Sequence, residues 1–179
     1  MSELPESLEF EEIFARFSDF DLANSIAGAV EEKYGYEAIM RWDERVPLTH
    51  RAVSFIWSVA GHGECQGYVA VLWMECQHSA IPLALREIGL DDLAEIMDAM
   101  MAPVIGTGAL GDLEKLESHF GGWEPFAAWV SGFQRDLFAA WDRICDAVAS
   151  YCRAHQEDYR ELLPELRESN AYREAFGCD

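Results

Sequence analysis

The sequence predicts an all-α fold, a single helical bundle of about eight helices around a buried central helix. Three observations predict it. Apolar residues recur at steps of three and four through most of the chain, which is typical of amphipathic helices. The segment 68–74 is apolar on every face, so we expect protein to surround it. No second segment has a strand pattern that could pair with it, which favours helix over sheet.

Length and composition favour one folded domain. A chain of 179 residues can bury a substantial core without disulfides or metals, and half of its residues are hydrophobic. We expect one domain over 1–179, in which residues 1–47 form N-terminal helices, 48–160 form the main core and 161–179 form a C-terminal helix. The N-terminal helices are expected to form a loosely attached hairpin.

The N-terminal elements follow from local signals. Residues 5–17 are expected to form the first helix, because Pro5 suits a first turn and the glutamates beside it complement the helix dipole. Asp19 or Asp21 is expected to cap a second helix. Gly35 should interrupt that helix.

The middle of the chain is expected to hold the central helix. A short helix ends before Pro47, because the residue before a proline disfavours helical geometry. Thr49 suits the N-cap of the next helix, and Gly61–Gly63 are expected to break it. The buried segment 68–74 follows, and Gly89 suits the position that closes the helix after it.

The C-terminal half carries the clearest helical pattern. Asp91 or Asp92 is expected to cap a helix. Residues 125–153 predict one long helix of about 43 Å, enough to cross the domain. Residues 158–176 predict a polar helix that is kinked or restarted at its proline.

Charge is the strongest functional signal in the sequence. Asp and Glu number 33 against 13 Lys and Arg, which gives a formal net charge of −20. A small domain needs a charge of only about 2–8 in magnitude for solubility. The excess predicts repulsion from nucleic acid and anionic membranes and attraction to basic surfaces. We therefore expect no direct nucleic-acid or membrane partner; a solvated surface without any partner is the simpler alternative.

We expect a cytoplasmic protein with reduced thiols. The stretch MSELPESLEFEEIF is acidic and lacks the long apolar core of a signal peptide. No run of about 18 apolar residues predicts a membrane span. The five cysteines are an odd number and lack the spacing of a disulfide framework.

His62, Cys65, Cys76 and His78 come nearest to a metal site. Their spacing, H-x2-C-x10-C-x-H, matches no common zinc pattern. If Cys65 and Cys76 share one helix, about 16 Å separates them along its axis, whereas zinc ligands bind at about 2.0–2.3 Å. The sequence also lacks G-x-S-x-G, H-E-x-x-H and G-x-G-x-x-G. We therefore expect no catalytic residues, no metal and no cofactor.

Carboxylates on polar helix faces are the candidate partner-binding residues. Pairs one turn apart, such as Asp91 and Glu95, stand about 6 Å apart along the axis, and duplex DNA has a phosphate about every 3.4 Å along each strand. Neighbouring acidic helices can therefore approach the charge density of DNA. Like charges one turn apart cost helix stability, which suggests that they are used. The predicted partner-binding residues are Glu31, Glu32, Asp91, Glu95, Asp98, Asp142, Asp146, Glu161 and Glu165.

Two stretches resemble a bacterial protein family. One has Gly61-His62-Gly63-Glu64, Tyr68 and AIPLALREIG (80–89) before an acidic helix start, and the other is LFAAWDRICDAVASYCRAHQEDY (137–159). Together they resemble the C-terminal domain of the DNA-mimic protein family, a mostly uncharacterised all-α family, over roughly residues 48–160. The resemblance implies a strongly acidic helical protein that occupies the DNA-binding surface of a transcriptional regulator.

Charge and resemblance together predict a non-enzymatic interaction module, a monomer or homodimer that binds a basic protein such as a transcriptional regulator. An immunity protein that neutralises a basic nuclease is the second interaction hypothesis. The enzyme alternative is a small metal-dependent enzyme that uses His62, Cys65 and His78. Binding that weakens with salt and is competed by duplex DNA would favour the interaction module. Rescue from a co-expressed toxin would favour the immunity protein. Stoichiometric zinc in the purified protein would favour the metal-dependent enzyme.

Overall fold

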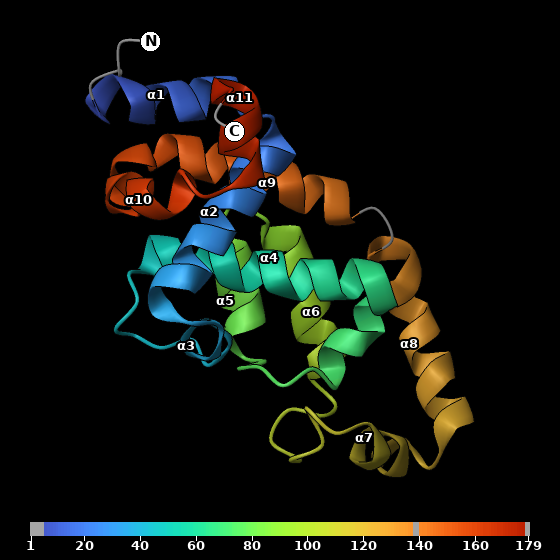
Figure 1. The fold of residues 1–179 in the computed structure, drawn as a ribbon. Helices are drawn as coiled ribbons and strands as arrows, with labels where there is room; N and C mark the ends of the chain where they lie inside the picture. Colours follow the sequence, from blue (N-terminus) through green and yellow to red (C-terminus); the bar gives the residue numbers. More distant parts are fainter. Residues whose placement is uncertain (1–5, 138–139, 178–179) are drawn as a thin grey trace.

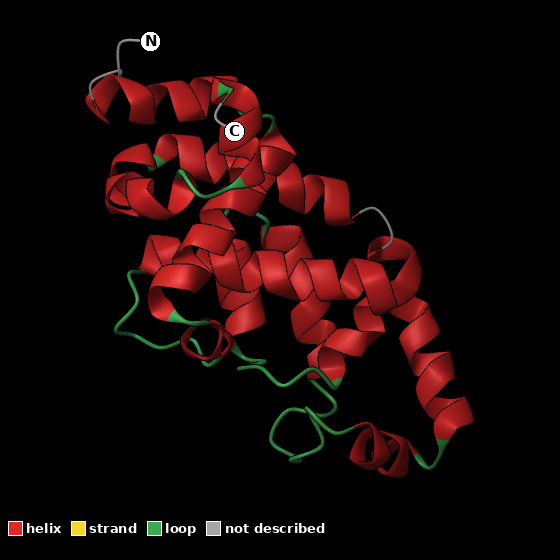
Figure 2. Cartoon of the chain, in the orientation of Figure 1, coloured by secondary structure: helices red, strands yellow, loops and turns green. Residues whose placement is uncertain are grey.

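The protein is an all-α bundle, as the sequence predicts. The computed structural model describes residues 6–137 and 140–177. Within those ranges the secondary structure consists of helices, joined by turns and loops (Figures 1 and 2). The expected number was about eight helices, whereas the described residues form eleven α-helices and two short 3₁₀-helices. The count is higher because, in the described ranges, the segment 125–153 holds two helices, and the tail after residue 155 holds a 3₁₀-helix and two α-helices.

In chain order, the helices are α1 (Glu6–Arg16), α2 (Asp19–Tyr34), α3 (Tyr36–Met40), α4 (Leu48–Gln66), η1 (Tyr68–Leu72), α5 (Ala80–Glu87), α6 (Asp91–Met101), α7 (Leu113–Phe120), α8 (Trp123–Leu137), α9 (Ala140–Ala154), η2 (Gln156–Leu162), α10 (Leu163–Leu166) and α11 (Asn170–Phe176). No helix in the described ranges is both long and apolar enough to cross a membrane.

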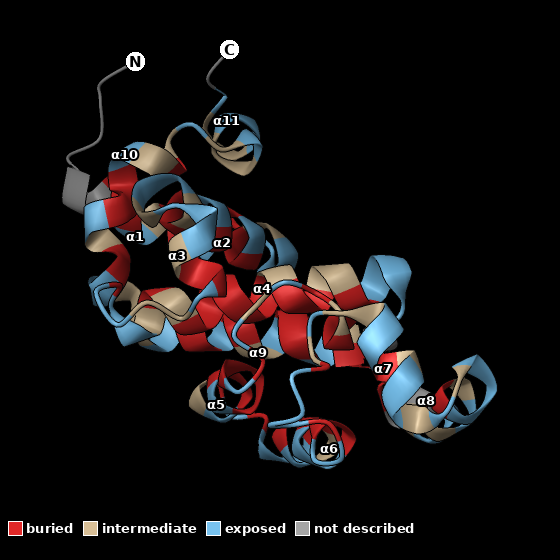
Figure 3. Cartoon of the chain, turned by 90° about the horizontal axis from the view of Figure 1, so that it is seen from below, coloured by how far each residue is buried: buried red, intermediate tan, exposed pale blue. Residues whose placement is uncertain are grey.

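The buried central helix is α4, not the segment 68–74. It packs against α2, α5, η1 and α9, and its residues are buried along most of its length (Figure 3). The predicted break at Gly61–Gly63 is wrong, because α4 continues to Gln66 and ends at Gly67, whose φ of +86° favours glycine. A glycine inside a helix costs about 1 kcal/mol relative to alanine, and tertiary packing of α4 outweighs that cost.

Residues 70–72 and 74 of the segment 68–74 are buried as predicted, Trp73 is partly buried, and the segment is not an α-helix. The burial of residues 68 and 69 lies outside what the structure describes. Ala70, Val71 and Leu72 are fully buried against α4. They belong to the 3₁₀-helix η1, after which the chain turns at Trp73. Hydrophobicity on all faces predicted the burial. Gly67 before the segment prevents it from joining α4 as one helix.

The predicted single helix over 125–153 is wrong. The structure has two helices, α8 and α9, whose axes run in different directions (Figure 1). Residues 138 and 139 between them lie outside the described ranges. α8 packs against α6 and α7, whereas α9 packs against α2 and α4. The apolar pattern continues through both helices because each needs a buried face, although the faces meet different partners.

The N-terminal helices are not a loosely attached hairpin. α2 packs against α4 and α9 at the centre of the bundle, and α1 contacts α11 near the C-terminus. The tail restarts near its proline as predicted, with Pro164 in the first turn of α10.

The predicted N-cap residues of α2 and α4 are wrong, although both predicted helices form. Ser18 caps α2 in place of the predicted Asp19 or Asp21: its hydroxyl accepts a hydrogen bond from the Asp21 amide at 3.1 Å. α4 begins directly after Pro47 without a side-chain cap, so Thr49 is not its N-cap.

Asp91 and Asp92 lie in the first turn of α6, and neither caps it. A carboxylate there still interacts favourably with the helix dipole. Gly89 follows α5 as predicted, with a φ of +83° and a bond of 2.8 Å from the Leu90 amide to the Leu85 carbonyl.

Candidate functional site

The nine predicted partner-binding carboxylates lie in two separate groups. Glu31 and Glu32 on α2 lie near Glu161 on η2 and Glu165 on α10, because α2 packs against both of those elements. The second group consists of Asp91, Glu95 and Asp98 on α6 and Asp142 and Asp146 on α9.

Three of the nine carboxylates have partners inside the fold. Glu31 accepts hydrogen bonds from the hydroxyls of Ser54 at 3.3 Å and Ser58 at 2.5 Å, which join α2 to α4. Asp98 forms an ion pair with Arg86. Glu161 is the third, and its contacts form a separate cluster. These residues help to hold the fold and are poorer candidates for a partner surface.

The Glu161 cluster surrounds a buried histidine on α4. Glu161 accepts a hydrogen bond from the Tyr34 hydroxyl at 2.6 Å and pairs with Lys33 at 3.2 Å. The His50 Nε2 group donates to the Asp158 carbonyl at 2.8 Å, while Nδ1 lies 3.7 Å from Glu161. Burial lowers the pKa of His50, which keeps the ring neutral near neutral pH.

The acidic groove is the strongest candidate site. It is a depression of about 400 Å³ between α2 on one side and the segment from α10 to α11 on the other. The acidic groove is lined by five carboxylates: Asp21, Glu32, Glu165, Glu168 and Glu174. Glu32 and Glu165 were predicted as partner-binding residues. The remaining three were not.

Helical spacing was the signal that could have found one of the missed residues. Asp21 and Glu32 are eleven positions apart on α2, or about three turns, so they lie on one face roughly 16 Å apart along the axis. The missed residues Glu168 and Glu174 carry no comparable signal, because only the turn between α10 and α11 brings them opposite α2.

Polar groups in the acidic groove are left without partners inside the protein. The Oε2 atom of Glu165 is buried and has no hydrogen-bond partner among the described residues. Ser25 lines the groove, is only 6% exposed, and forms no hydrogen bond to another described side chain or carbonyl. Glu168 pairs with Arg173 at 3.3 Å, but both side chains are half or more exposed, so this pair contributes little. The described lining of the groove therefore has five carboxylates and no lysine or arginine.

The C-terminal wall of the groove is held by a contact that sequence reasoning missed. Glu9 on α1 is 7% exposed and accepts two hydrogen bonds from Arg167, at 2.8 and 2.7 Å, and one from the Tyr172 hydroxyl on α11. The Arg167 hydrogen bond is the main reason why the pKa of Glu9 is lowered. We call these three residues the clasp. No local pattern could predict it, because Glu9 is more than 150 residues from both Arg167 and Tyr172 in the chain.

The four residues of the zinc hypothesis occupy different surroundings. His62 and Cys76 line a second groove, Cys65 is exposed near the end of α4, and His78 is buried with its Nε2 group donating to the Val71 carbonyl at 3.0 Å. Burial raises the pKa of Cys76 to about 12, so its thiol is protonated at neutral pH. Among the described residues, no three His, Cys, Asp or Glu side chains are grouped as metal ligands would be.

Comparison with protein-family models, with curated proteins and with solved structures finds no match to this chain. The resemblance to DNA-mimic proteins therefore stays a prediction.

Proposed function

We propose that this chain is a non-enzymatic cytoplasmic interaction module that binds a basic protein through the acidic groove. In this proposal its carboxylates take the place of the phosphates that the partner otherwise contacts. A nucleic-acid-binding protein, such as a transcriptional regulator, is the class of partner that fits.

The observation that carries this proposal is the composition of the groove. Five carboxylates converge from α2, α10, the turn after α10 and α11, and lysine and arginine are absent from the described lining. Arginine binds carboxylates with two parallel hydrogen bonds, and lysine binds them as a point charge. The exposed carboxylates of Glu32, Glu168 and Glu174 would accept hydrogen bonds from such donors.

The shape of the groove favours an extended basic segment over a single ion. The carboxylates at its two ends on α2, Asp21 and Glu32, lie roughly 16 Å apart along the helix, far beyond the reach of one cation. An extended chain spans at most about 3.3–3.6 Å per residue, so five residues cover this distance. The net charge of −20 would also accelerate association with a basic surface and make it strongly dependent on salt.

The test compares two variants that each remove three charges. Glu32→Gln, Glu168→Gln and Glu174→Gln remove three of the five carboxylates of the groove. Glu95→Gln, Asp142→Asn and Asp146→Asn remove the same number at exposed residues of α6 and α9. Proteins are captured from a lysate of the source cells, identified, and then eluted with salt or with duplex DNA. We expect nucleic-acid-binding proteins to be captured by the wild type and the control, lost with the groove variant, and released by DNA.

Two results would overturn the proposal. Equal loss with both variants would show that only total charge matters. Capture that survives in the groove variant would show that the partner does not bind at the groove. Capture that duplex DNA does not compete would show that the protein does not mimic DNA. A captured nuclease instead of a regulator would favour the immunity hypothesis.

A further inference from the structure

A second groove, of about 600 Å³, lies between α3, the C-terminal half of α4 and residues 73–77. It shares no lining residue with the acidic groove. His62 and Gln66 are one turn apart on α4 and both line it, so one face of that helix forms a wall. Its volume falls in the range of about 300–1,000 Å³ that is typical of small-molecule sites. We call it the aromatic groove.

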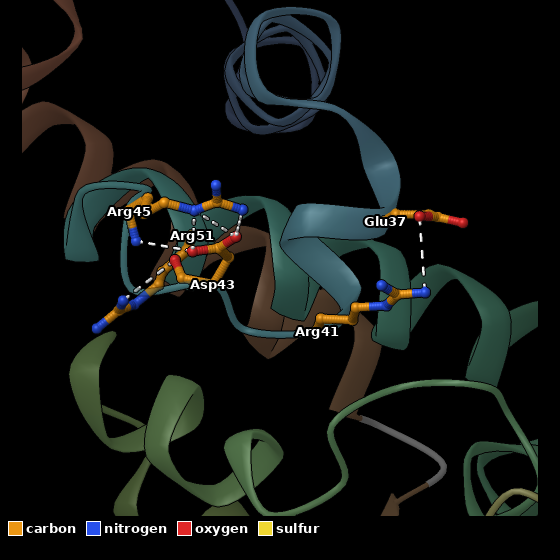
Figure 4. Close-up of polar contacts among 5 residues, drawn as sticks. All are labelled: Glu37, Arg41, Asp43, Arg45 and Arg51. Atoms are coloured by element: carbon orange, nitrogen blue, oxygen red, sulfur yellow. Dashed lines mark hydrogen bonds and ion pairs between the residues drawn. The ribbon is translucent and has the colours of Figure 1, made fainter.

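The walls of the aromatic groove are held in place by contacts between lining residues and by contacts in the turn after α3. The Gln77 amide donates to the Met40 carbonyl at 2.8 Å, which ties the 73–77 segment to the end of α3. In the turn after α3, Asp43 accepts hydrogen bonds from Arg45, and its own carbonyl accepts one from Arg51 at 3.3 Å (Figure 4).

The same turn holds Trp42 in a conformation that is rare for a residue other than glycine. Its φ is +55°, and the Arg51 guanidinium lies over its ring at 4.9 Å. The ring also packs edge-on against Phe55 in α4, with centroids 5.3 Å apart. These contacts fix the end of α3 relative to α4, so this groove is formed before any ligand binds.

Part of the lining of the aromatic groove is apolar and aromatic. Met40 and Met74 are almost fully buried, Trp73 is partly buried, and Tyr36 is 51% exposed. Methionine adapts its shape to a ligand, and the faces of tyrosine and tryptophan attract cations. The surface of the groove is therefore suited to a ligand with a flat or aliphatic body.

The charge of this lining is negative. Its charged residues are Glu37, Glu75 and Arg41. Arg41 is 75% exposed and directed at Glu37, 3.6 Å away along α3 (Figure 4). Glu75 is exposed and has no ion pair among the described residues. With a net charge of −20 around it, the groove repels anions and concentrates cations.

We infer that the aromatic groove binds a small organic monocation with an apolar body, an arylalkyl ammonium compound. The apolar body would pack against Met40, Met74 and Trp73. The ammonium group would lie between the Glu75 carboxylate and the Tyr36 ring. A neutral compound of the same shape lacks the ammonium contacts with Glu75 and Tyr36, and an anion is repelled by the negative charge of the groove.

The experiment uses methionine methyl groups as local probes. The full chain is labelled with ¹³C at the methionine methyls and titrated with three compounds that share one ring: 2-phenylethylamine, 2-phenylethanol and 3-phenylpropionate. We expect the amine to shift the Met40 and Met74 signals saturably, with a Kd on the order of 1 mM for so small a ligand. The alcohol should bind about tenfold more weakly, and the acid should not bind. Met97, Met100 and Met101 lie in the core on α6 and serve as internal controls.

Two single variants locate the ammonium group. Glu75→Gln should weaken amine binding about threefold to tenfold and leave alcohol binding unchanged. Glu114→Gln, at an exposed site on α7 that does not line the groove, should change neither. The inference is overturned if the amine and the alcohol bind equally, if Met40 and Met74 show no saturable shift at millimolar amine, or if Glu114→Gln weakens binding as much as Glu75→Gln.

Discussion

Two helices face each other across the acidic groove, and the fold holds them by different means. α2 buries residues along most of its length against α4 and α9. α11, on the opposite side, has no buried residue and is held by Tyr172 of the clasp and by Phe176, which lies 5.1 Å from the Arg16 guanidinium. One wall thus belongs to the core, and the other is attached by a few polar and aromatic contacts. This difference predicts that α11 can move while the α2 wall stays in place.

The largest effect is expected in the core wall. Ile26 on α2 is fully buried, so Ile26→Ala should lower the free energy of unfolding by about 3 kcal/mol. Urea unfolding monitored by circular dichroism gives this value. Leu83→Ala, at a site that is 53% exposed on α5, is the control and should change it by less than about 0.5 kcal/mol. A small loss for Ile26→Ala would contradict the central position of α2.

A somewhat smaller effect is expected when the clasp is broken. Arg167→Ala leaves the Glu9 carboxylate buried without its main partner and should cost about 2 kcal/mol. That is less than the 3–5 kcal/mol of a fully buried pair, because the Arg167 side chain is 38% exposed.

Hydrogen exchange distinguishes local from global loosening in this variant. Amides of α11 should exchange faster in Arg167→Ala, whereas amides of α2 keep their protection up to the global limit. Equal acceleration in both helices would show that the two walls do not differ as proposed.

The third prediction concerns pH and two buried histidines, His50 on α4 and His78 just before α5. Burial lowers the pKa of both His50 and His78 in the folded protein. In the unfolded chain both histidines have the ordinary pKa of about 6.5. As the pH falls through about 6.5, the unfolded chain therefore binds protons before the folded protein does. Stability from these residues is complete above about pH 6.5 and falls as the pH drops towards their folded pKa values.

We expect a loss of about 1 kcal/mol between pH 7 and 5.5, above the range in which most carboxylates titrate. His50→Gln should reduce this slope, and His119→Gln, at an exposed site on α7, should not. Urea unfolding at each pH provides the measurement, and a stability that is flat over this window would refute the prediction.

The smallest effect is expected from the groove carboxylates themselves. Neutralising Glu32, Glu168 and Glu174 together relieves like-charge repulsion across the groove and should stabilise the protein by about 0.5 kcal/mol at low salt. The gain should vanish near 1 M salt, because screening already removes the repulsion there. Destabilisation would show that these residues support the fold, which would weaken the case for a binding role.

Predictions from sequence succeeded where the signal lies within one element. Helical periodicity, the burial of Ala70 to Leu72 and the helix end at Gly89 all depend on nearest neighbours along the chain. Predictions failed where tertiary packing overrides a local signal. Gly61 and Gly63 indicated a break, yet α4 is helical through both, because the packing around it outweighs the propensity of two glycines.

By itself, the sequence determined the helical class, the excess of negative charge and the carboxylates available to carry it. Only the tertiary structure decided which of them share a surface. It turned Glu31 towards two serines of α4, brought Glu165 and Glu174 opposite Glu32, and buried Glu9 in the clasp. The physical reason is range: periodicity acts over a few residues, whereas a groove depends on contacts between segments more than 100 residues apart in the chain.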